Sequence, residues 1–181
     1  MGYVDDGAYS CGHKDPAILS DILTEKFDNL SVWMQNNKLV NDPDKTNLLV
    51  LGPKKFDRKR NEVSITAGNF TIKPTDTAKL LGCWIHQSLK WNRHLLEGKS
   101  SLVHQLTMRN NALNRVSKNA SFSTKLMIAN GVFHSKLVYM ITVWGGAPQY
   151  LINALQVQQL RAARTVCGFQ SMGWSRRRLL R

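Results

Sequence analysis

The hydrophobic pattern of this chain changes its period near residue 91, and that change limits the folds that are open to it. From Trp91 onward, apolar residues recur at the spacing of an amphipathic helix. They predict three helices, which begin after Trp91, near Ser123 and near Pro148. Ser123 is a candidate N-cap for the second helix, which ends near Val143. We therefore expect an all-α helical bundle over residues 91–170. The side chains expected in its core are Leu102, Val103, Leu106, Leu113, Val116, Leu151, Ile152, Leu155, Leu160, Ala163 and Val166.

The first half of the chain combines one helical pattern with several strand patterns. Asp15 and Pro16 are a favourable N-cap and first helical residue, and the apolar stripe behind them runs to Asn36. Short apolar runs predict strands at 46–51, 63–65, 70–72 and 79–85. The second and third of these flank Ala67-Gly68-Asn69, which is hairpin chemistry. The predicted fold class is α+β: short strands and one amphipathic helix in residues 1–90, followed by the bundle.

The positive charge of the chain is confined to its second half. Residues 1–90 hold 12 Lys and Arg against 11 Asp and Glu, whereas residues 91–181 hold 13 Lys and Arg and a single acid, Glu97. A basic segment that is almost free of acids is typical of proteins that bind a polyanion, most often nucleic acid. A cationic surface that only favours solubility is the alternative that composition leaves open.

Two short basic segments lie outside the main elements. Residues 54–60, KKFDRKR, have the composition of an exposed loop, and contact with phosphate or a nuclear-import signal are the functional alternatives. Residues 171–181 contain WSRRRLLR and no clear core position, so we expect a basic, disordered tail.

The three cysteines, Cys11, Cys83 and Cys167, are odd in number and widely spaced. They favour reduced thiols in an intracellular protein, in the nucleus or the cytoplasm. Cys83 and His86 have the C-x-x-H spacing of zinc ligands, but residues three apart on a strand point to opposite faces, so a structural cysteine and a surface histidine are favoured. The longest apolar run, 137–147, is too short to span a bilayer, and no membrane partner is expected.

Two adjacent carboxylates, Asp5 and Asp6, follow Tyr3 near the start of the sequence. Neighbouring side chains on a regular strand point in opposite directions, but at the bend of a hairpin both can approach one cation. Mg²⁺ prefers carboxylate oxygens, and two such ions about 3.5–4 Å apart stabilise phosphoryl transfer. Such a site needs another carboxylate from a second strand. By composition alone, an Asp-Asp pair is more often a solvated acidic turn.

Five stretches of the sequence stand in a distinctive order. They are YVDD at 3–6, WMQNNKLVNDPDKTNLLVLG at 33–52, KLLGCWIHQSLKWNRHL at 79–95, FHSKLVYMITVWGG at 133–146 and LQVQQLRAAR at 155–164. Together they span nearly the whole chain. Their order resembles the C-terminal part of a reverse transcriptase of the non-LTR, LINE-type, retrotransposon family. The resemblance implies a partial polymerase palm in residues 1–90 and a helical thumb in residues 91–170.

The resemblance also implies roles for single residues. Asp5, with Asp6 beside it, would hold the catalytic Mg²⁺ ions of the parent enzyme, which adds nucleotides from dNTPs, and Tyr3 would pack near the primer end. Lys45 lies in the family's Lys-Thr motif, where a lysine is proposed to aid proton transfer to pyrophosphate; a strand-edge charge is the structural alternative. Residues 80–82 resemble the hairpin that supports the primer strand.

The thumb would grip an RNA template that is paired with a DNA primer. Such an RNA–DNA hybrid is recognised mostly through its shape and its phosphates, which suits scattered cations on helices. The residues expected to contact it are Lys99, Arg109, Arg115, Lys118, Arg161 and Arg164. Arg161 and Arg164 also fit a structural interpretation, because cations near a helix C-terminus favour its dipole.

The sequence departs from the family pattern at three points. Asp42 stands where Asn is common, and His86 stands where an acid is frequent. The palm of the family carries a further catalytic Asp on an upstream strand, and no such strand precedes Met1 in this sequence. We therefore expect a fragment of an RNA-directed DNA polymerase that does not polymerise DNA by itself. The alternative is a non-catalytic, basic nucleic-acid-binding module derived from a retroelement.

Overall fold

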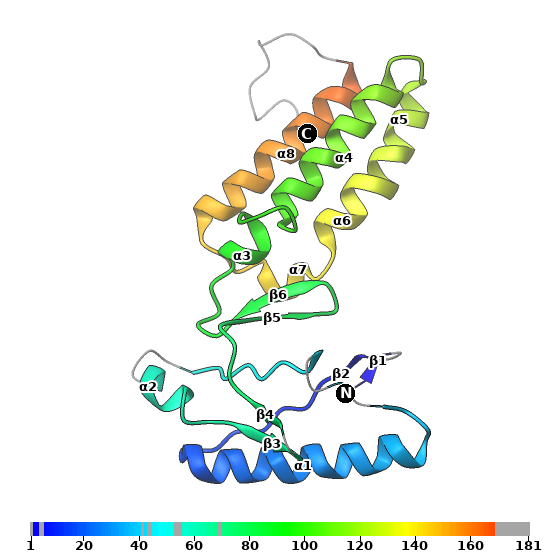
Figure 1. The fold of residues 1–181 in the computed structure, drawn as a ribbon. Helices are drawn as coiled ribbons and strands as arrows, with labels where there is room; N and C mark the ends of the chain where they lie inside the picture. Colours follow the sequence, from blue (N-terminus) through cyan, green and yellow to red (C-terminus); the bar gives the residue numbers. More distant parts are fainter. Residues whose placement is uncertain are drawn as a thin grey trace. The chain divides into compact units, whose positions relative to one another are not determined.

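The computed structural model of the chain describes residues 2–3, 6–40, 42, 45–52, 56–68 and 70–168. It is a mixed helix and sheet structure, α+β in class (Figure 1). The chain divides between Leu89 and Lys90 into two compact units, and we call their described parts the N-terminal unit and the helical unit. Each unit has its own cluster of buried apolar side chains. The expected basic tail, 171–181, lies outside the described residues.

Helix α1, Pro16–Asn36, forms where the sequence predicts it. Asp15 caps the helix, because its Oδ1 accepts a hydrogen bond from the Ala17 N–H at 2.9 Å. The middle of the apolar stripe packs on the buried cluster of the N-terminal unit through Leu19, Leu23 and Phe27. The end of the stripe does not join that cluster: Trp33 is 57% exposed.

The hairpin predicted after residue 62 is confirmed, with its first strand two residues later than expected. Strand β3, Ile65–Ala67, pairs antiparallel with β4, Phe70–Ile72, and Ile65 lies opposite Ile72. Hydroxyl groups of α1 accept hydrogen bonds from backbone N–H groups at β3: Ser20 from Ser64 and Thr24 from Thr66, each at 3.2 Å. The helix therefore satisfies donors that a short hairpin would otherwise leave at its edge.

The strand predicted at 46–51 is wrong. In this part of the described chain, Leu48 forms a single parallel bridge to Pro74, and Thr75 N–H donates to Leu48 O at 2.8 Å. Among the described residues this bridge is isolated and does not extend into a ladder. Leu48 is buried whereas Leu51 is 53% exposed, so the apolar run is not a strand buried along its length.

Residues 77–86 form a hairpin instead of the single strand predicted at 79–85. Strand β5, Thr77–Leu80, pairs antiparallel with β6, Cys83–His86. Both turn residues have positive φ, 47° at Leu81 and 83° at Gly82, as a type I′ turn requires. Leucine rarely adopts this conformation, so the apolar run concealed the turn.

The basic segment 54–60 is not an exposed loop in its described part. Residues Asp57–Arg60 form a helical turn, α2, and Arg60 is 4% exposed. The Arg60 guanidinium lies 2.6 Å from the Asp57 carboxylate and donates to the backbone carbonyl of Gly52. Arg60 therefore holds the turn against the segment before it, which a row of similar cations in the sequence does not reveal. Residues 54 and 55 lie outside the described residues.

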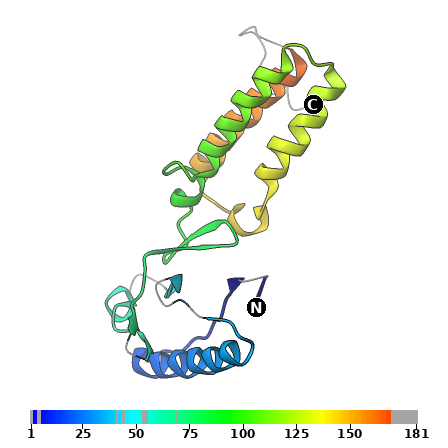
Figure 2. The same ribbon diagram turned by 45° about the vertical axis from the view of Figure 1, so that its right-hand side comes forward.

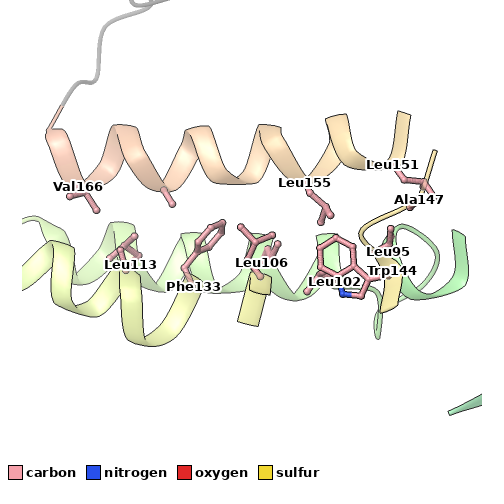
Figure 3. Packing of buried hydrophobic residues seen from close by; sticks show 13 residues of the cluster. Leu95, Leu102, Leu106, Leu113, Phe133, Trp144, Ala147, Leu151, Leu155 and Val166 are labelled. Carbon is pink, nitrogen blue, oxygen red and sulfur yellow. The ribbon is translucent and has the colours of Figure 1, made fainter. Parts of the chain in front are cut away.

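The two long helices of the helical unit, α4 (Leu102–Ser117) and α8 (Gln149–Cys167), pack side by side and run in the same direction (Figures 1 and 2). Figure 3 shows Leu113 beside Val166 at one end of this contact, and Leu102 toward Leu151 at the other. Buried positions repeat every three or four residues on both helices, which gives a continuous seam. They are Leu102, Leu106, Asn110, Leu113, Ser117, Leu151, Leu155, Gln158, Ala162 and Val166.

The core predicted for the bundle is correct for most of its leucines and wrong at a few positions. Val116 is 54% exposed, and Ala162 is buried in place of Ala163, which is half-buried like Leu160. The spacing of apolar residues also does not predict that the polar residues Asn110 and Gln158 are buried on the seam. Apolarity alone does not distinguish a residue on the seam from its neighbour one position away, because the two differ by about 100° around the helix.

The helix predicted from 123 to 143 begins earlier and is interrupted. Helix α5, Phe122–Ile128, starts after Ser121, whose Oγ accepts from Thr124 N–H at 3.2 Å, so the predicted cap at Ser123 is wrong. The chain continues through a π-helical segment, η3 (Ala129–His134), into α6 (Ser135–Val138).

The interruption lies between α6 and the short helix α7, Ile141–Trp144. Met140 adopts the left-handed conformation there, with φ 54°. The side chain of Trp144 is buried and its Nε1 donates to Tyr139 O at 3.0 Å. The break therefore has a tertiary partner, which a helical spacing of apolar residues cannot predict.

Two further features complete the helical unit. A short helix, α3 (Asn92–Leu95), precedes α4, and Asn92 Oδ1 accepts from the Tyr150 hydroxyl of α8 at 2.9 Å. Helix α8 begins after Pro148, as predicted, and ends at Gly168 with φ 75°. None of the described helices combines the length and apolar character that crossing a bilayer requires.

Candidate functional site

The Tyr-x-Asp-Asp motif belongs to a short hairpin. Strand β1, Gly2–Tyr3, pairs antiparallel with β2, Asp6–Gly7, and Tyr3 lies opposite Asp6 in the register. Two residues separate the strands in the sequence, which is the commonest connection in a β-hairpin. Asp5 and the side chains of Tyr3 and Asp6 lie outside what the structure describes.

The chemistry of the Asp5 and Asp6 carboxylates fits Mg²⁺, a hard ion that prefers oxygen ligands. Within the described ranges, no group of three or more His, Cys, Asp and Glu side chains is placed to hold a metal ion. The backbone pairing with Tyr3 places Asp6 at the first position of β2. Metal binding by Asp5 and Asp6 stays a prediction.

Lys45, the other catalytic candidate, forms an exposed ion pair. Its Nζ lies 3.2 Å from Asp42 Oδ2, and the Lys45 side chain is 84% exposed. An exposed pair of this kind contributes at most about 1 kcal/mol. The contact joins Lys45 to Asp42, one of the two residues at which the sequence departs from the pattern that it resembles. Asp42 and Lys45 are three residues apart in the sequence, and this spacing could have predicted the ion pair.

Cys83 and His86 do not share an environment. Cys83 is fully buried, as a structural cysteine would be. The half-buried His86 has a local partner in Ser88: its Nδ1 accepts from the Ser88 N–H at 3.0 Å and lies 2.8 Å from the Ser88 hydroxyl oxygen. Cys11 and Cys167 are exposed free thiols.

Four of the six cations expected to contact nucleic acid gather at one end of the helical unit. A buried contact fixes the level of the two long helices: Asn110 Nδ2 donates to Gln158 O at 2.9 Å and lies 3.2 Å from Gln158 Oε1. Because α4 and α8 run parallel, residues beyond this level lie toward the same end, within about 12 Å along the axis. Arg115, Lys118, Arg161 and Arg164 all lie beyond it, and all are exposed.

The other two expected contacts lie elsewhere. Lys99 precedes the N-terminus of α4, at the opposite end of that helix. Arg109 is half-buried, and its Nη1 donates to the backbone carbonyl of Val132 in η3 at 2.8 Å. Arg109 therefore has a structural role in joining α4 to the second helical segment, which the sequence did not reveal.

Sequence reasoning missed two side chains at the same end as the four gathered cations. Helix α5 begins there, because α4 ends at Ser117 and a short turn leads to Phe122. This helix contacts both α4 and α8. It carries the half-buried Lys125 and the exposed Phe122. A turn predicted directly after α4 would have placed Phe122 and Lys125 at the same end as the four cations.

We call the five cations Arg115, Lys118, Lys125, Arg161 and Arg164 the cationic pole. The one acid of residues 91–181, Glu97, precedes α4 and so lies toward the opposite end. Among the described residues, no carboxylate forms an ion pair with any member of the pole. Its positive charge is therefore not neutralised within the described structure.

A buried histidine lies near the opposite end of the seam. His94 of α3 is 6% exposed, and its ring centroid lies 6.5 Å from that of Trp144. Burial, and secondarily the positive charge of Lys136, lower the pKa of His94 from its ordinary value of 6.5. The neutral imidazole is therefore the favoured form in the folded unit.

Comparison of the chain with protein-family models, with curated proteins and with solved structures finds no match.

Proposed function

We propose that this chain is part of a reverse transcriptase of the non-LTR retrotransposon type. In this proposal the N-terminal unit supplies palm residues, and the helical unit binds the hybrid of RNA template and DNA primer. The ordered sequence motifs support the first half of the proposal. The second half is carried by one observation: a helical unit with its own core and a single acid gathers five cations at one end.

Binding would be electrostatic and independent of base sequence. Each phosphate neutralised by Lys or Arg releases condensed counterions, so affinity falls steeply as salt rises. The cations of the pole are mostly exposed and can reach phosphates without first breaking an ion pair to a described carboxylate. An A-form-like hybrid offers phosphates and 2′-hydroxyls to such a surface, while its bases stay stacked.

The direct test is a salt titration of binding to a fluorescein-labelled RNA–DNA hybrid of 20 base pairs. We expect a linear fall of log affinity with log salt, with a slope of about −0.9 per phosphate contacted. Arg161→Gln with Arg164→Gln should flatten the slope by nearly two such increments. The matched control, Lys14→Gln with Lys26→Gln, removes two exposed cations of the N-terminal unit and should leave the slope unchanged. Affinity without salt dependence would refute the proposal.

Asp5 and Asp6 are the proposed metal ligands of the parent enzyme, where Mg²⁺ would promote nucleotidyl transfer. The two carboxylates do not make a complete two-metal site, which needs at least one more ligand. We therefore expect the 181-residue chain to incorporate no dNTP on a primed RNA template. Template-directed incorporation that Asp5→Ala abolishes would contradict this expectation.

A non-catalytic nucleic-acid-binding module is the second candidate. The observation that favours it is that the core and the cations of the helical unit lie entirely within residues 90–168. The two candidates differ in their dependence on a primer end. A palm fragment should prefer a hybrid with a recessed 3′ end over a blunt one when Mg²⁺ is present, and Asp5→Ala should remove the preference. A module should bind both hybrids equally, with or without that substitution.

A further inference from the structure

We propose that the cationic pole binds a single-stranded polynucleotide, with Phe122 as the surface on which a base stacks. The inference rests on the proposed function, since it assumes that the helical unit binds nucleic acid. It adds a second kind of ligand: unpaired nucleotides next to the hybrid, held at the end of the helices where α4 and α8 finish and α5 begins.

The helix dipole accounts for only part of the pole. Cations in the last turn of a helix favour the dipole, which suits Arg115, Lys118 and Arg164. Arg161 lies more than a turn before the end of α8, at Cys167. Lys125 is the fourth residue after the N-cap Ser121, near the N-terminal side of the helical segment that runs from α5 into η3 and α6, so the dipole of that segment does not favour it. Two of the five charges thus require another reason for their position.

Apolar side chains are exposed beside the charges. Phe122 is 59% exposed, Val116 is 54% exposed and Met127 is 67% exposed. Phe122 follows Ser121, the N-cap of α5, and so lies four residues after Lys118. An aromatic ring next to Lys and Arg is the combination on which proteins stack the bases of single strands. A continuous duplex keeps its base faces covered, so it has no use for such a ring except at its ends.

The sequence continues the same chemistry beyond the described residues. Helix α8 ends at Gly168, at the pole, and the 13 residues that follow contain four arginines and no acid. The chain therefore adds positive charge from the point where the pole already concentrates it.

Fluorescence anisotropy of the full 181-residue chain with two probes tests the inference. The probes are a labelled 12-nucleotide oligouridine, which does not pair with itself, and a blunt RNA–DNA hybrid of 20 base pairs. Phe122→Ala should weaken binding of oligouridine roughly tenfold, because a stacked base contributes about 1–3 kcal/mol. The same substitution should change binding of the hybrid by less than about twofold. Phe122→Trp should retain the affinity for oligouridine, since it keeps a stacking face.

The cations are tested by the salt slope for oligouridine. Arg161→Gln with Arg164→Gln should reduce the slope by about 1.4, at roughly 0.7 per phosphate of a single strand. The control pair Lys14→Gln with Lys26→Gln should not change it. Circular dichroism of each variant checks that the helices form. Phe122 is exposed enough for its truncation to leave the core intact.

The outcomes separate the inference from the function on which it rests. If the wild-type chain binds the hybrid with a steep salt slope but Phe122→Ala binds oligouridine as the wild type does, the stacking proposal alone is wrong. An equal loss for both probes also overturns it, because the ring would then serve both ligands. If the wild-type chain binds neither probe, the proposed nucleic-acid binding fails as well.

Discussion

His94 makes the stability of the helical unit depend on pH. Its pKa is lowered in the folded chain by burial and by the charge of Lys136, so the unfolded chain takes up the proton first as pH falls. The contribution of neutral His94 to the free energy of unfolding should therefore be fully present above about pH 6.5. It should decrease as the pH falls below that value and stop decreasing below the pKa of His94 in the folded chain. Each unit by which the pKa is lowered corresponds to about 1.4 kcal/mol.

The measurement is the free energy of urea unfolding between pH 5 and 7.5. His94→Gln should remove most of the pH dependence in this range, even where it lowers stability at every pH. His104→Gln alters an exposed histidine of α4 and is the matched control, so it should keep the dependence of the wild type. The same dependence in His94→Gln as in the wild type would refute the assignment.

Arg60 stabilises the N-terminal unit through a contact that only its fork of donors can make. One guanidinium nitrogen binds the Asp57 carboxylate and another donates to Gly52 O. Arg60→Met should cost about 1–3 kcal/mol, because the carbonyl of the half-buried Gly52 loses its donor. Arg60→Lys should recover only part of this, since an ammonium group is a single point of charge. Arg58→Met, at an exposed position of the same turn, should cost less than about 0.5 kcal/mol in thermal or urea unfolding.

Burial is the residue-scale property that the sequence predicted least well. Composition marked 54–60 as a basic loop, yet Arg60 is buried while Arg58 and Lys59 are exposed. The same holds for Asn110 and Gln158, two polar residues within stripes of apolar ones. Asn110 and Gln158 are 48 positions apart, and Arg60 reaches back eight positions to the carbonyl of Gly52, so the spacing of apolar residues predicts neither burial.

At the scale of elements, the buried contact between Asn110 and Gln158 fixes how α4 and α8 align. Asn110 Nδ2 serves both oxygens of Gln158, while Asn110 Oδ1 is buried and has no hydrogen-bond partner among the described residues. Asn110→Leu should cost about 1–3 kcal/mol, because it leaves Gln158 Oε1 buried without this donor. Gln158→Leu should cost less, because Asn110 keeps its bond to the backbone carbonyl of residue 158.

The double variant completes this test. Asn110→Leu with Gln158→Leu replaces both polar groups, so its stability in urea unfolding should exceed that of Asn110→Leu alone and approach or surpass the wild type. Additive losses in the double-mutant cycle would show that the two side chains do not act as a pair.

The hairpin of β5 and β6 contains a turn residue that is not the most stable choice. Leu81 has φ 47°, which costs about 1–2 kcal/mol for an ordinary residue, whereas Asn-Gly is a favoured pair for a type I′ turn. Leu81→Asn should therefore raise the free energy of unfolding by roughly 0.5–1 kcal/mol. If the hairpin supports a primer strand, the same variant should weaken binding of a recessed hybrid. Lys79→Asn changes a strand position of the same hairpin and should not stabilise it.

Elements whose ends are set by local chemistry were predictable from the sequence, and elements set by tertiary contact were not. Asp15-Pro16 predicts the start of α1 and Pro148 that of α8, because capping and proline geometry act within a few residues. The break at Met140 depends on Trp144 reaching back to Tyr139, and the turn at Leu81 on the pairing of two strands. Periodicity therefore extended one helix and one strand through these points.

At the scale of the whole molecule, the helical unit contains all the parts that it needs for an independent fold. Its buried cluster runs from Leu95 to Val166 and includes no residue from the N-terminal unit. Residues 90–168 expressed alone should therefore give a helical circular dichroism spectrum and a cooperative unfolding transition. A gradual, non-cooperative transition would contradict this. In the fragment, Leu106→Ala should lower the free energy of unfolding by about 2–5 kcal/mol, because it leaves a cavity in the core. Met108→Ala, at an exposed position, should change it little.

The sequence predicted which kind of residue makes up the candidate site, but not where these residues lie in the fold. The excess of Lys and Arg after residue 91 indicated a polyanion partner, since charge can be counted without a fold. Five of these cations share one end of the unit because α4 and α8 run parallel. Two consecutive long helices can be parallel only if a segment between them brings the chain back to the starting end. The return segment supplies Phe122 and Lys125, which no count of charges identifies.

That parallel course also sets the order in which the helical unit can fold. Asn110 and Gln158 are 48 positions apart in the chain, and the seam between their helices is the most extensive contact between described helices of the unit. During synthesis, α4 leaves the ribosome before its main neighbour, α8, exists. Until then it can associate only with its other neighbours, α3, α5, η3 and α6. The seam closes when the 19 residues of α8 emerge, at the loop-closure cost of a long connection. A nascent chain that stalls before α8 would present the apolar stripe of α4 to other proteins, which makes this interval the one in which aggregation competes with folding.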